Sequence, residues 1–566
     1  MSVLQTSERW LPRIGVFLLP LAFFWDTYDQ FVLPKLLLAR IFLLALAALF
    51  IGRALVSRTI VVRRTALDIP ILVFLASAVL STVFAVNRNV AIFGIYTRYD
   101  GLLTLATYAG LFWLSVQMLH HSGDARGLTR VMLLSGYLVA AIAIYQSASD
   151  SVQEGAIAPA FGTLGNANVL GAFLAMLCPL AFGELIRATS WSTRILALNV
   201  LIVVGIALVL SFSRSAWLGA LVGAAIIVAA NPRLGLRFAI VGLGLIGILL
   251  VVGRTTGNPT GLERLVEARA LTIVDPNAWG ASRVHIWRDS TALIASRPLL
   301  GYGPDSFGLV FPRFETGDWG LGARDQHQQV DKAHAEVLQI AATQGLVGVA
   351  AYLLILAAFI RSAWRGRRVD GLVLFAGWLA YTITVQLNFT ALAAAFPFWI
   401  FAAACIVTWQ TRSVITSIVV PRSRGVQAVG GLAIAGLAAL FVVFVVPPYL
   451  ADADLPRAVS ADARGSSDAT ALAEQSRRLA PQESVYAVES ANLAFEGRHW
   501  IAARDAYEDA ARLGTYNPLV YRNLALADVQ LGNRVGARAA ALEALELNRF
   551  DPANQALLAQ FATGPP

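Results

Sequence analysis

Residues 331–360, DKAHAEVLQIAATQGLVGVAAYLLILAAFI, decide the fold class of this protein. No charged residue follows Glu336 in this stretch. A helix needs about 20 apolar residues to cross the hydrocarbon core of a bilayer, and the uncharged part of this run is long enough. The sequence therefore predicts a membrane-spanning helix over residues 334–360.

Runs of this kind occur along most of the chain and predict an all-α, polytopic membrane protein. The 566 residues are 57% hydrophobic and only 14% charged, with a mean hydropathy of +0.64. Soluble proteins average about 25% charged residues, so the composition excludes a cytosolic enzyme and a disordered scaffold. The two cysteines lie inside apolar runs, which excludes a disulfide-rich secreted protein. Thirteen spans are expected, near residues 14–31, 35–52, 66–86, 101–119, 128–147, 167–186, 194–211, 214–230, 236–252, 334–360, 369–390, 392–410 and 426–448.

The distribution of arginine predicts the orientation of these spans. With the N-terminus inside, the cytoplasmic segments hold 19 basic residues and the short segments on the opposite side hold five. Basic residues are enriched in cytoplasmic loops, so we expect a cytoplasmic N-terminus and an external C-terminus. Because this pattern accounts for the pI near 9.8, we expect membrane lipids as partners and no nucleic acid.

Two hydrophilic segments fall on the predicted outer face: a large loop, 253–333, and the tail, 449–566, which follows a transmembrane domain of residues 1–448. The tail contains an internal repeat of 34 or 35 residues, which relates Gly497 to Gly532, Ala503 to Ala537, Ala510 to Ala544, and Pro518 to Pro552. This period resembles the tetratricopeptide repeat, a helical module that binds peptides or protein partners. Residues 465–485 fit the second helix of a degenerate repeat, and an ordinary amphipathic helical tail is the alternative.

Arg214, in the segment SFSRSAWLG (211–219), lies between two apolar runs. A charge near hydrocarbon costs about 2.5–3.5 kcal/mol at a helix centre on insertion scales. Either the side chain marks a helix end by snorkelling to the interface, or its planar guanidinium binds a phosphate on the outer face.

The outer loop contains ASRVHIWRDSTALIASRPLLGYGPDSF (281–307). The pattern predicts an amphipathic helix that ends at Arg297, followed by a glycine turn, and Trp and Leu suggest that the helix lies on the bilayer surface. Arg283 and Arg288 on this helix are either solvated charges or phosphate ligands.

His334 opens the tenth predicted span at its outer end. A helix N-terminus disfavours a protonated imidazole, so this side chain should be neutral and able to accept a proton. Asp331 or Asp325 could orient the ring, whereas Glu336 lies on another helix face. A structural, hydrogen-bonding histidine is the alternative.

Four segments of the chain resemble the O-antigen ligase and polymerase family. They are IYTRYDGLLT (95–104), FGTLGNANVLGAFL (161–174), SRSAWLG (213–219) and KAHAEVLQIAATQGLVG (332–348). Arg214 and Leu218 match the R-x3-L motif of the ligases, and His334 and Gly345 match their H-x10-G motif. The resemblance covers roughly residues 60–410.

The resemblance implies a GT-C-like fold in the bacterial cytoplasmic membrane and transfer of a glycan from undecaprenyl diphosphate to an acceptor hydroxyl outside it. Neither metal nor cofactor is implied. His334 becomes the general base and Arg214 and Arg288 hold the diphosphate, with Arg98 and Arg283 as further candidates. The thirteenth span and the repeat domain depart from the typical ligase, so the acceptor is open: a lipid, a glycan or a protein.

Other functions remain open at this point. Within the same family, the chain could be a repeat-unit polymerase or a protein O-oligosaccharyltransferase. A polysaccharide transporter and a non-catalytic scaffold built on the repeat domain are the alternatives from other classes. The sequence shows no metal-ligand spacing, phosphate-binding glycine loop or nucleophile elbow, and the sparse acids Asp26, Asp29 and Asp100 are a weak cation alternative.

Overall fold

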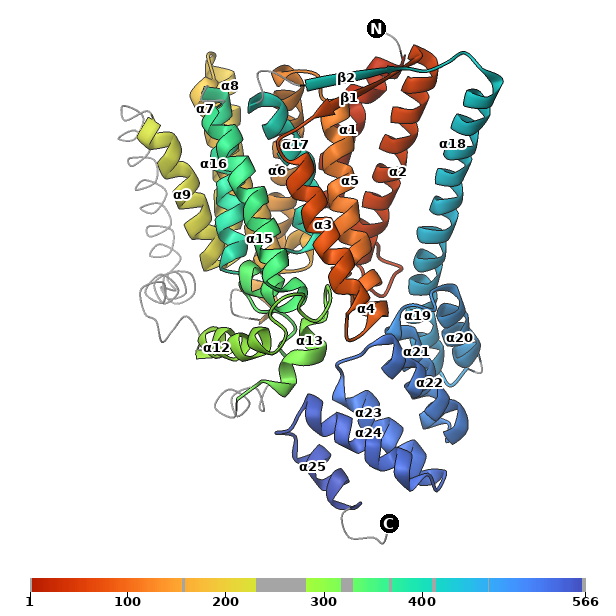
Figure 1. Ribbon diagram of the computed structural model, residues 1–566. Helices are drawn as coiled ribbons and strands as arrows, with labels where there is room; N and C mark the ends of the chain where they lie inside the picture. Colours follow the sequence, from red (N-terminus) through yellow and green to blue (C-terminus); the bar gives the residue numbers. More distant parts are fainter. Residues whose placement is uncertain are drawn as a thin grey trace, which may run out of the picture.

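The computed structural model describes residues 3–154, 158–230, 281–316, 329–365, 369–409, 414–466 and 468–561. These residues form an all-α protein with one pair of short strands. Figure 1 shows a bundle of roughly parallel helices with the N-terminus at one end and the C-terminal helices at the other.

Helices that fit a membrane make up the bundle. Seven are long and apolar enough to cross a bilayer: α2 (Val32–Ser57), α6 (Ser122–Glu154), α7 (Ala167–Arg187), α8 (Trp191–Leu210), α15 (Glu336–Arg365), α17 (Leu392–Trp409) and α18 (Arg424–Phe444), which continues into α19 (Val446–Ala463). Four apolar helices are shorter: α3 (Asp68–Val83), α5 (Leu102–Met118), α9 (Arg214–Ala230) and most of α16 (Val369–Gln386). The chain is therefore a multi-pass membrane protein. The span expected at 236–252 lies outside the described residues, and the total of thirteen remains a prediction.

The first span predicted from the sequence, 14–31, is wrong in its second half. Helix α1 covers Val3–Leu21, and no helix forms again until α2 begins at Val32. The Asp29 carboxylate accepts hydrogen bonds from the backbone N–H groups of Phe31, Val32 and Leu33 at 2.8–3.1 Å. These bonds satisfy the donors at the start of α2, so the polar segment before it forms a loop rather than continuing α1.

The bundle helices differ in how deeply they are buried. In α7 and α17, 78% and 83% of the apolar window is buried inside the protein, whereas the figure for α18 is 11%. Helix α18 packs on α2 at the edge of the bundle (Figure 1). The apolar surface of α18 therefore faces lipid, while α7 and α17 form the core on which the other helices pack.

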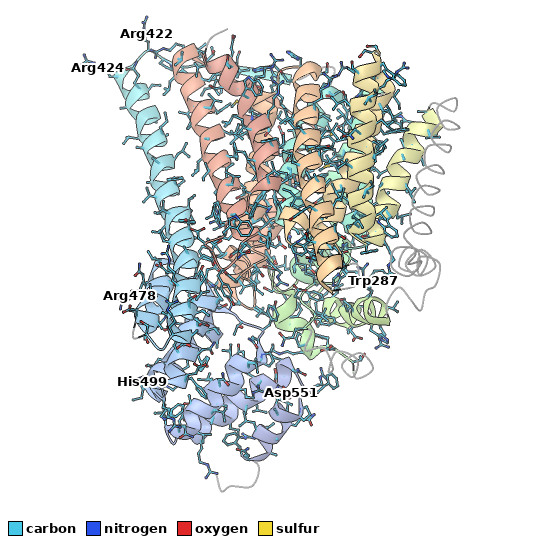
Figure 2. The ribbon with its side chains drawn as sticks, turned by 180° about the vertical axis from the view of Figure 1, so that it is seen from behind. Trp287, Arg422, Arg424, Arg478, His499 and Asp551 are labelled. Carbon is cyan, nitrogen blue, oxygen red and sulfur yellow. The ribbon has the colours of Figure 1, made fainter. Side chains whose placement is uncertain are left out.

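Two strands, β1 (Thr59–Arg64) and β2 (Val414–Val419), pair antiparallel at the N-terminal end of the bundle (Figure 1). They are the only strands in the part of the chain that the structure describes. Arg422 and Arg424 lie at this same end (Figure 2). The predicted cytoplasmic segments thus include a small sheet that the apolar pattern did not predict.

The end of the bundle that the sequence predicts to be external, called the outer end below, carries loop helices and two short 3₁₀ turns. They are α4 (Arg88–Phe93), α12 (Ala281–Ser296), α13 (Phe307–Val310), η1 (Gly162–Leu164) and η2 (Phe311–Arg313). Helix α12 confirms the helix predicted before Arg297, and it runs across the ends of the bundle helices (Figure 1). The glycine turn that follows is built into a break in α15. The backbone N–H groups of Tyr302 and Gly303 donate to the carbonyls of Ala342 and Thr343, at 3.0 and 2.8 Å.

Gly345 makes that break possible. Its backbone has φ 68° and ψ −171°, a conformation that favours glycine. A Cβ atom added here would lie 2.2 Å from the carbonyl carbon of Leu299. The spacing of His334 and Gly345 therefore has a structural reason, because the break joins the outer loop to the helix that follows His334.

The variant Gly345→Ala is expected to destabilise the protein and displace the outer loop, because the new methyl group cannot fit against Leu299. An unfavourable backbone conformation alone costs about 1–3 kcal/mol. Thermal unfolding in detergent would measure the loss. Gly205→Ala in α8 is the control, since a Cβ at Gly205 has no neighbour within 4 Å. Equal melting temperatures for the two variants would contradict the role assigned to Gly345.

The C-terminal helices form antiparallel pairs that follow the predicted period. Helices α21 (Ser484–Glu496), α23 (Pro518–Gln530) and α25 (Pro552–Ala559) begin 34 residues apart, as do α22 (Trp500–Leu513) and α24 (Arg534–Leu547). The repeated alanines, Ala503, Ala510, Ala537 and Ala544, are all fully buried. Within 465–485, helix α20 (Asp468–Leu479) packs on α19. The predicted domain boundary at 448 falls in the first turn of α19, which runs from the bundle into these repeats.

Candidate active site

His334 lies in the loop that precedes α15, at the outer end of the bundle. Its ring packs edge-on against Phe389, with 5.4 Å between ring centroids, and the Asn388 side chain lies beside it. The Nδ1 atom is buried and has no hydrogen-bond partner among the described residues. A buried polar atom without a partner is unusual and needs an explanation, and a site for accepting a substrate proton provides one.

Two elements hold the backbone beside His334. The indole N–H of Trp287, on α12, donates to the carbonyl oxygen of Ala333 at 3.0 Å. The backbone N–H of Ala333 in turn donates to the side-chain oxygen of Gln339, on α15, at 2.9 Å. Trp287 lies at the end of the bundle that also carries the repeat helices (Figure 2). Helix α12 therefore positions the histidine loop rather than only covering the bilayer surface.

Arg283 comes from the same helix and reaches the same region. Its guanidinium donates to the carbonyl oxygen of Leu387 at 2.8 Å, next to Asn388. Burial, and then the positive charge of Arg214, lower the pKa of Arg283. Arg283 also acts electrostatically on His334. Arg283 thus lies within electrostatic range of both Arg214 and His334, which are far apart in the sequence, and we call these three residues the positively charged centre.

Arg214 is the first residue of α9, at the positive end of the helix dipole. The turn before it is tight, with Phe212 at φ 49°. Gly171 of α7 packs against this turn, and a Cβ at Gly171 would lie 2.7 Å from the Cβ of Ser213. Gly171, the last glycine of the segment FGTLGNANVLGAFL, thus lets α7 approach the start of α9 closely. A helix N-terminus with an arginine at its first position attracts an anion.

The structure does not bring Arg288 or Arg98 into this centre. Arg288, 49% exposed, pairs with Asp289 at 3.2 Å and also contacts Thr316. Arg98 is buried between two carboxylates, at 3.1 Å from Asp305 and 3.0 Å from Asp331. Of the four arginines predicted as diphosphate ligands, Arg214 and Arg283 therefore lie with His334, and the other two have different partners.

A buried polar network behind His334 was missed by the sequence-based reasoning. Lys332 donates to Asp100 at 2.6 Å, and its ammonium lies 4.6 Å from the ring centroid of Phe389. Asp100 and Lys332, with Glu336, line a cavity of about 70 Å³. Glu336 accepts a hydrogen bond from the backbone of Thr390 at 2.9 Å rather than contacting the imidazole. One signal for this network was present, because Lys332 is one of only two lysines in the chain.

Strained backbone conformations gather around these residues. Five non-glycine residues in or beside this region have positive φ angles of 49–68°, namely Thr97, Tyr99, Phe212, Asp305 and His334 itself. Such conformations cost about 1–3 kcal/mol each and cluster at functional sites. The packing at the outer end of the bundle therefore stabilises these unfavourable backbone conformations, which fix the positions of a few polar side chains.

The environment of His334 keeps its imidazole neutral. Burial, followed by the positive charge of Arg283, lowers the pKa of His334 to about 4, although Asp331 opposes the shift. The neutral state agrees with the sequence-based prediction, but its main causes are burial and Arg283 rather than the helix N-terminus. Asp331 also pairs with Arg98, and Asp325, the other predicted orienting residue, lies outside the described residues.

The pKa of His334 predicts an unusual pH profile. The neutral ring is the form that accepts a proton, so kcat/KM should be constant at neutral pH and fall only near pH 4. An unperturbed histidine would give this acidic limb near pH 6.5. If the diphosphate implied by the family resemblance binds here, it offsets the charge of Arg283, so the limb in kcat should lie at higher pH than the limb in kcat/KM. Initial rates between pH 4 and 8 would measure both, and a kcat/KM limb near 6.5 would contradict the assignment.

Two comparisons with known proteins were made. Residues 197–353 match a family model described as O-Antigen ligase. A search of curated proteins finds no match. Within the matched segment lie α9, α12 and the loop before α15, which supply the three residues of the positively charged centre. The chain is thus similar to the O-antigen ligase family across the segment that carries Arg214, Arg283 and His334.

Proposed function

We propose that this protein is a glycosyltransferase of the O-antigen ligase type. It transfers a glycan from a polyprenyl-diphosphate carrier to an acceptor hydroxyl on the outer face of the bacterial cytoplasmic membrane. One observation carries the proposal: His334, a neutral histidine with an unpartnered ring nitrogen, lies within electrostatic range of Arg283, which in turn lies within range of Arg214. The similarity of residues 197–353 to the O-antigen ligases supports a transferase of the ligase or polymerase type.

The two arginines suit the donor. When the bond between the sugar and the diphosphate breaks, negative charge grows on the leaving oxygen. Arg214, aided by the N-terminus of α9, and Arg283 supply positive charge and planar hydrogen-bond donors for phosphate oxygens. Because Arg283 is largely buried, its contacts with phosphate are strengthened by the low local dielectric.

His334 suits the acceptor. The acceptor hydroxyl attacks the anomeric carbon of the donor sugar, and its proton passes to a ring nitrogen of His334. A new carbon–oxygen bond forms as the bond to the diphosphate breaks, so the products are the glycosylated acceptor and polyprenyl diphosphate. The imidazolium formed here lies beside Arg283 and therefore loses its proton readily to the leaving diphosphate or to water. In this scheme the residues of the chain supply the acid–base and electrostatic steps, and we expect no metal or cofactor.

Reconstitution tests the proposal. Purified protein in sealed proteoliposomes would be incubated with a polyprenyl-diphosphate glycan and, in separate reactions, a glycolipid, a second lipid-linked glycan and a hydroxyl-bearing peptide. Mass spectrometry would identify the product. A glycosylated glycolipid supports a ligase, an elongated lipid-linked glycan a polymerase, and a glycopeptide a protein O-oligosaccharyltransferase. Movement of the donor across the membrane without any product would instead indicate a transporter and refute the proposal.

The proposed reaction requires the site to face the outside of the cell. We expect the N-terminus in the cytoplasm and the repeat helices outside, because Arg422 and Arg424 lie at the end opposite Trp287 (Figure 2) and basic residues remain cytoplasmic. A reporter that is active only in the cytoplasm should be inactive after residue 566 and active before residue 1. The reverse result would place His334 on the wrong side of the membrane.

A further inference from the structure

A large cleft lies outside the proposed catalytic centre, between the repeat helices and the outer loop. Its volume is about 840 Å³, within the range of about 300–1,000 Å³ that is typical of ligand pockets. Ser484, Pro518 and Pro552, which begin α21, α23 and α25, line one wall. Phe311 and Val330 of the outer loop line the other. We call this space the repeat–loop cleft.

Direct contacts fix the two walls relative to each other. The Arg549 guanidinium donates to the carbonyl oxygens of Pro312 and Arg313 at 3.0 and 3.1 Å. Arg313 pairs with Glu546 at 2.9 Å. Beside the cleft, Asn89 donates to the backbone of α22 and of the turn before α21, at 2.8–3.0 Å. The cleft is therefore a preformed space and not a gap between loosely docked parts.

The lining of the cleft combines aromatic rings with neutral polar groups. Tyr96, Tyr516 and Phe550 contribute rings, and Asn517 and Asn548 contribute amides. Among its charged residues, Arg522 and Asp551 pair with each other at 3.4 Å, and Glu315 contributes a further carboxyl group. A sugar ring has an apolar C–H face and a rim of hydroxyl groups, so aromatic rings match the face, and amide and carboxyl groups match the hydroxyls.

A peptide fits this lining less well. Peptides that add a strand need a sheet edge, and the two described strands lie at the opposite end of the molecule (Figure 1). Peptide helices need a continuous apolar groove, whereas this wall consists of the ends of successive helices. Recognition of a peptide's C-terminal carboxylate would need an unpaired positive charge, and Arg522, the basic residue that lines the cleft, is paired with Asp551.

The cleft is continuous with the loop that carries His334. Gln329 and Val330 line it, and His334 follows Val330 by four residues, a span of at most about 14 Å. Tyr516 on the cleft wall lies under the guanidinium of Arg98, 5.6 Å from its ring centroid, and Arg98 binds Asp331. A chain of a few sugars in the cleft could therefore present its terminal hydroxyl to His334.

We propose that the repeat–loop cleft binds the acceptor oligosaccharide, and that the repeat helices thereby select the acceptor. This inference rests on the proposed transfer reaction but concerns a different step. Binding in the cleft requires neither His334 nor a donor, whereas transfer requires both. The two ideas can therefore fail separately.

Two cleft variants and one control test the inference. Phe550→Ala removes a ring, and Leu519→Glu places a carboxylate at a cleft position that is 47% exposed and therefore tolerant of substitution. Ile501→Ala is the control, because Ile501 is 61% exposed on α22 and does not line the cleft. Melting temperatures in detergent would confirm that all three proteins fold.

Labelled full-length protein would be applied to arrays of bacterial surface oligosaccharides and of peptides, including proline-rich ones. We expect binding to a subset of oligosaccharides, about tenfold weaker in both cleft variants and unchanged in Ile501→Ala and His334→Ala. In the transfer assay, the cleft variants should raise the acceptor KM by a similar factor and leave the donor KM unchanged. Binding to peptides alone, oligosaccharide binding that the cleft variants do not weaken, or an unchanged acceptor KM would overturn the inference. A protein that binds oligosaccharides through the cleft but transfers nothing would instead refute the proposed function.

Discussion

Replacing His334 with alanine is expected to slow glycan transfer by about 10²–10⁴-fold, the usual contribution of a general base. Donor affinity should change little, because His334 acts on the acceptor proton and the donor is held by Arg214 and Arg283. Initial rates and donor binding, measured separately on purified protein, would distinguish the two effects.

The control for this variant is His499→Ala. His499 is an exposed histidine before α22, in the repeat helices and away from the bundle (Figure 2), so its loss should leave the rate within a few-fold of wild type. A His334→Ala protein that transfers glycan as fast as His499→Ala would contradict the role of His334 as general base.

Replacing Arg214 or Arg283 with alanine is expected to lower kcat/KM by about 10²–10³-fold each, as for the loss of one donor to a developing oxyanion. Unlike His334→Ala, both variants should weaken donor binding as well, because the arginines contact the diphosphate before and during its departure. Lysine at either position should restore only part of the activity, since an ammonium keeps the charge but lacks the planar pair of donors.

Arg288→Ala provides a matched control on the same helix. Arg288 pairs with Asp289 at the protein surface rather than facing Arg214, so its loss should change kcat/KM by no more than a few-fold. A larger loss of kcat/KM in Arg288→Ala than in Arg283→Ala would contradict the orientation of α12, in which Arg283 and not Arg288 faces the site.

Several membrane helices could be predicted because each is determined by a local property. An apolar run predicts both ends of α7 to within one residue and the first residue of α9. The same reasoning failed for the first span. There the Asp29 carboxylate accepts hydrogen bonds from the backbone N–H groups that begin α2, so the residues between α1 and α2 form a loop. Apolar content does not reveal which residue caps a helix.

The paired strands β1 and β2 lie beyond sequence-based reasoning for another reason. They are about 350 residues apart, and each has a β-branched pattern that also occurs in loops between spans. Only the packing of the bundle brings them together, so no local signal predicts the pairing.

His334 and the four candidate arginines could be named from the sequence, but which of them lie near one another could not. His334 and Arg214 stand in recognisable motifs, whereas the choice between Arg283 and Arg288 depends on which face of α12 meets the bundle. Five helical residues turn the side-chain direction by about 140°, so the two arginines cannot face one site. The hydrogen bond from the Trp287 indole to the Ala333 carbonyl fixes the rotation of α12, and in this rotation Arg283 faces the His334 loop. The polar network of Asp100 and Lys332 depends on contacts across more than 200 residues and could not be predicted.

The most direct measurement of the central claim is a single-turnover reaction with excess enzyme and a labelled polyprenyl-diphosphate glycan, carried out in the presence of EDTA. The account predicts one molecule of polyprenyl diphosphate for each molecule of glycosylated acceptor. It also predicts that EDTA leaves the rate unchanged and that His334→Ala forms neither product at a comparable rate. An unchanged donor with every acceptor class, or equal rates in wild type and His334→Ala, would contradict it.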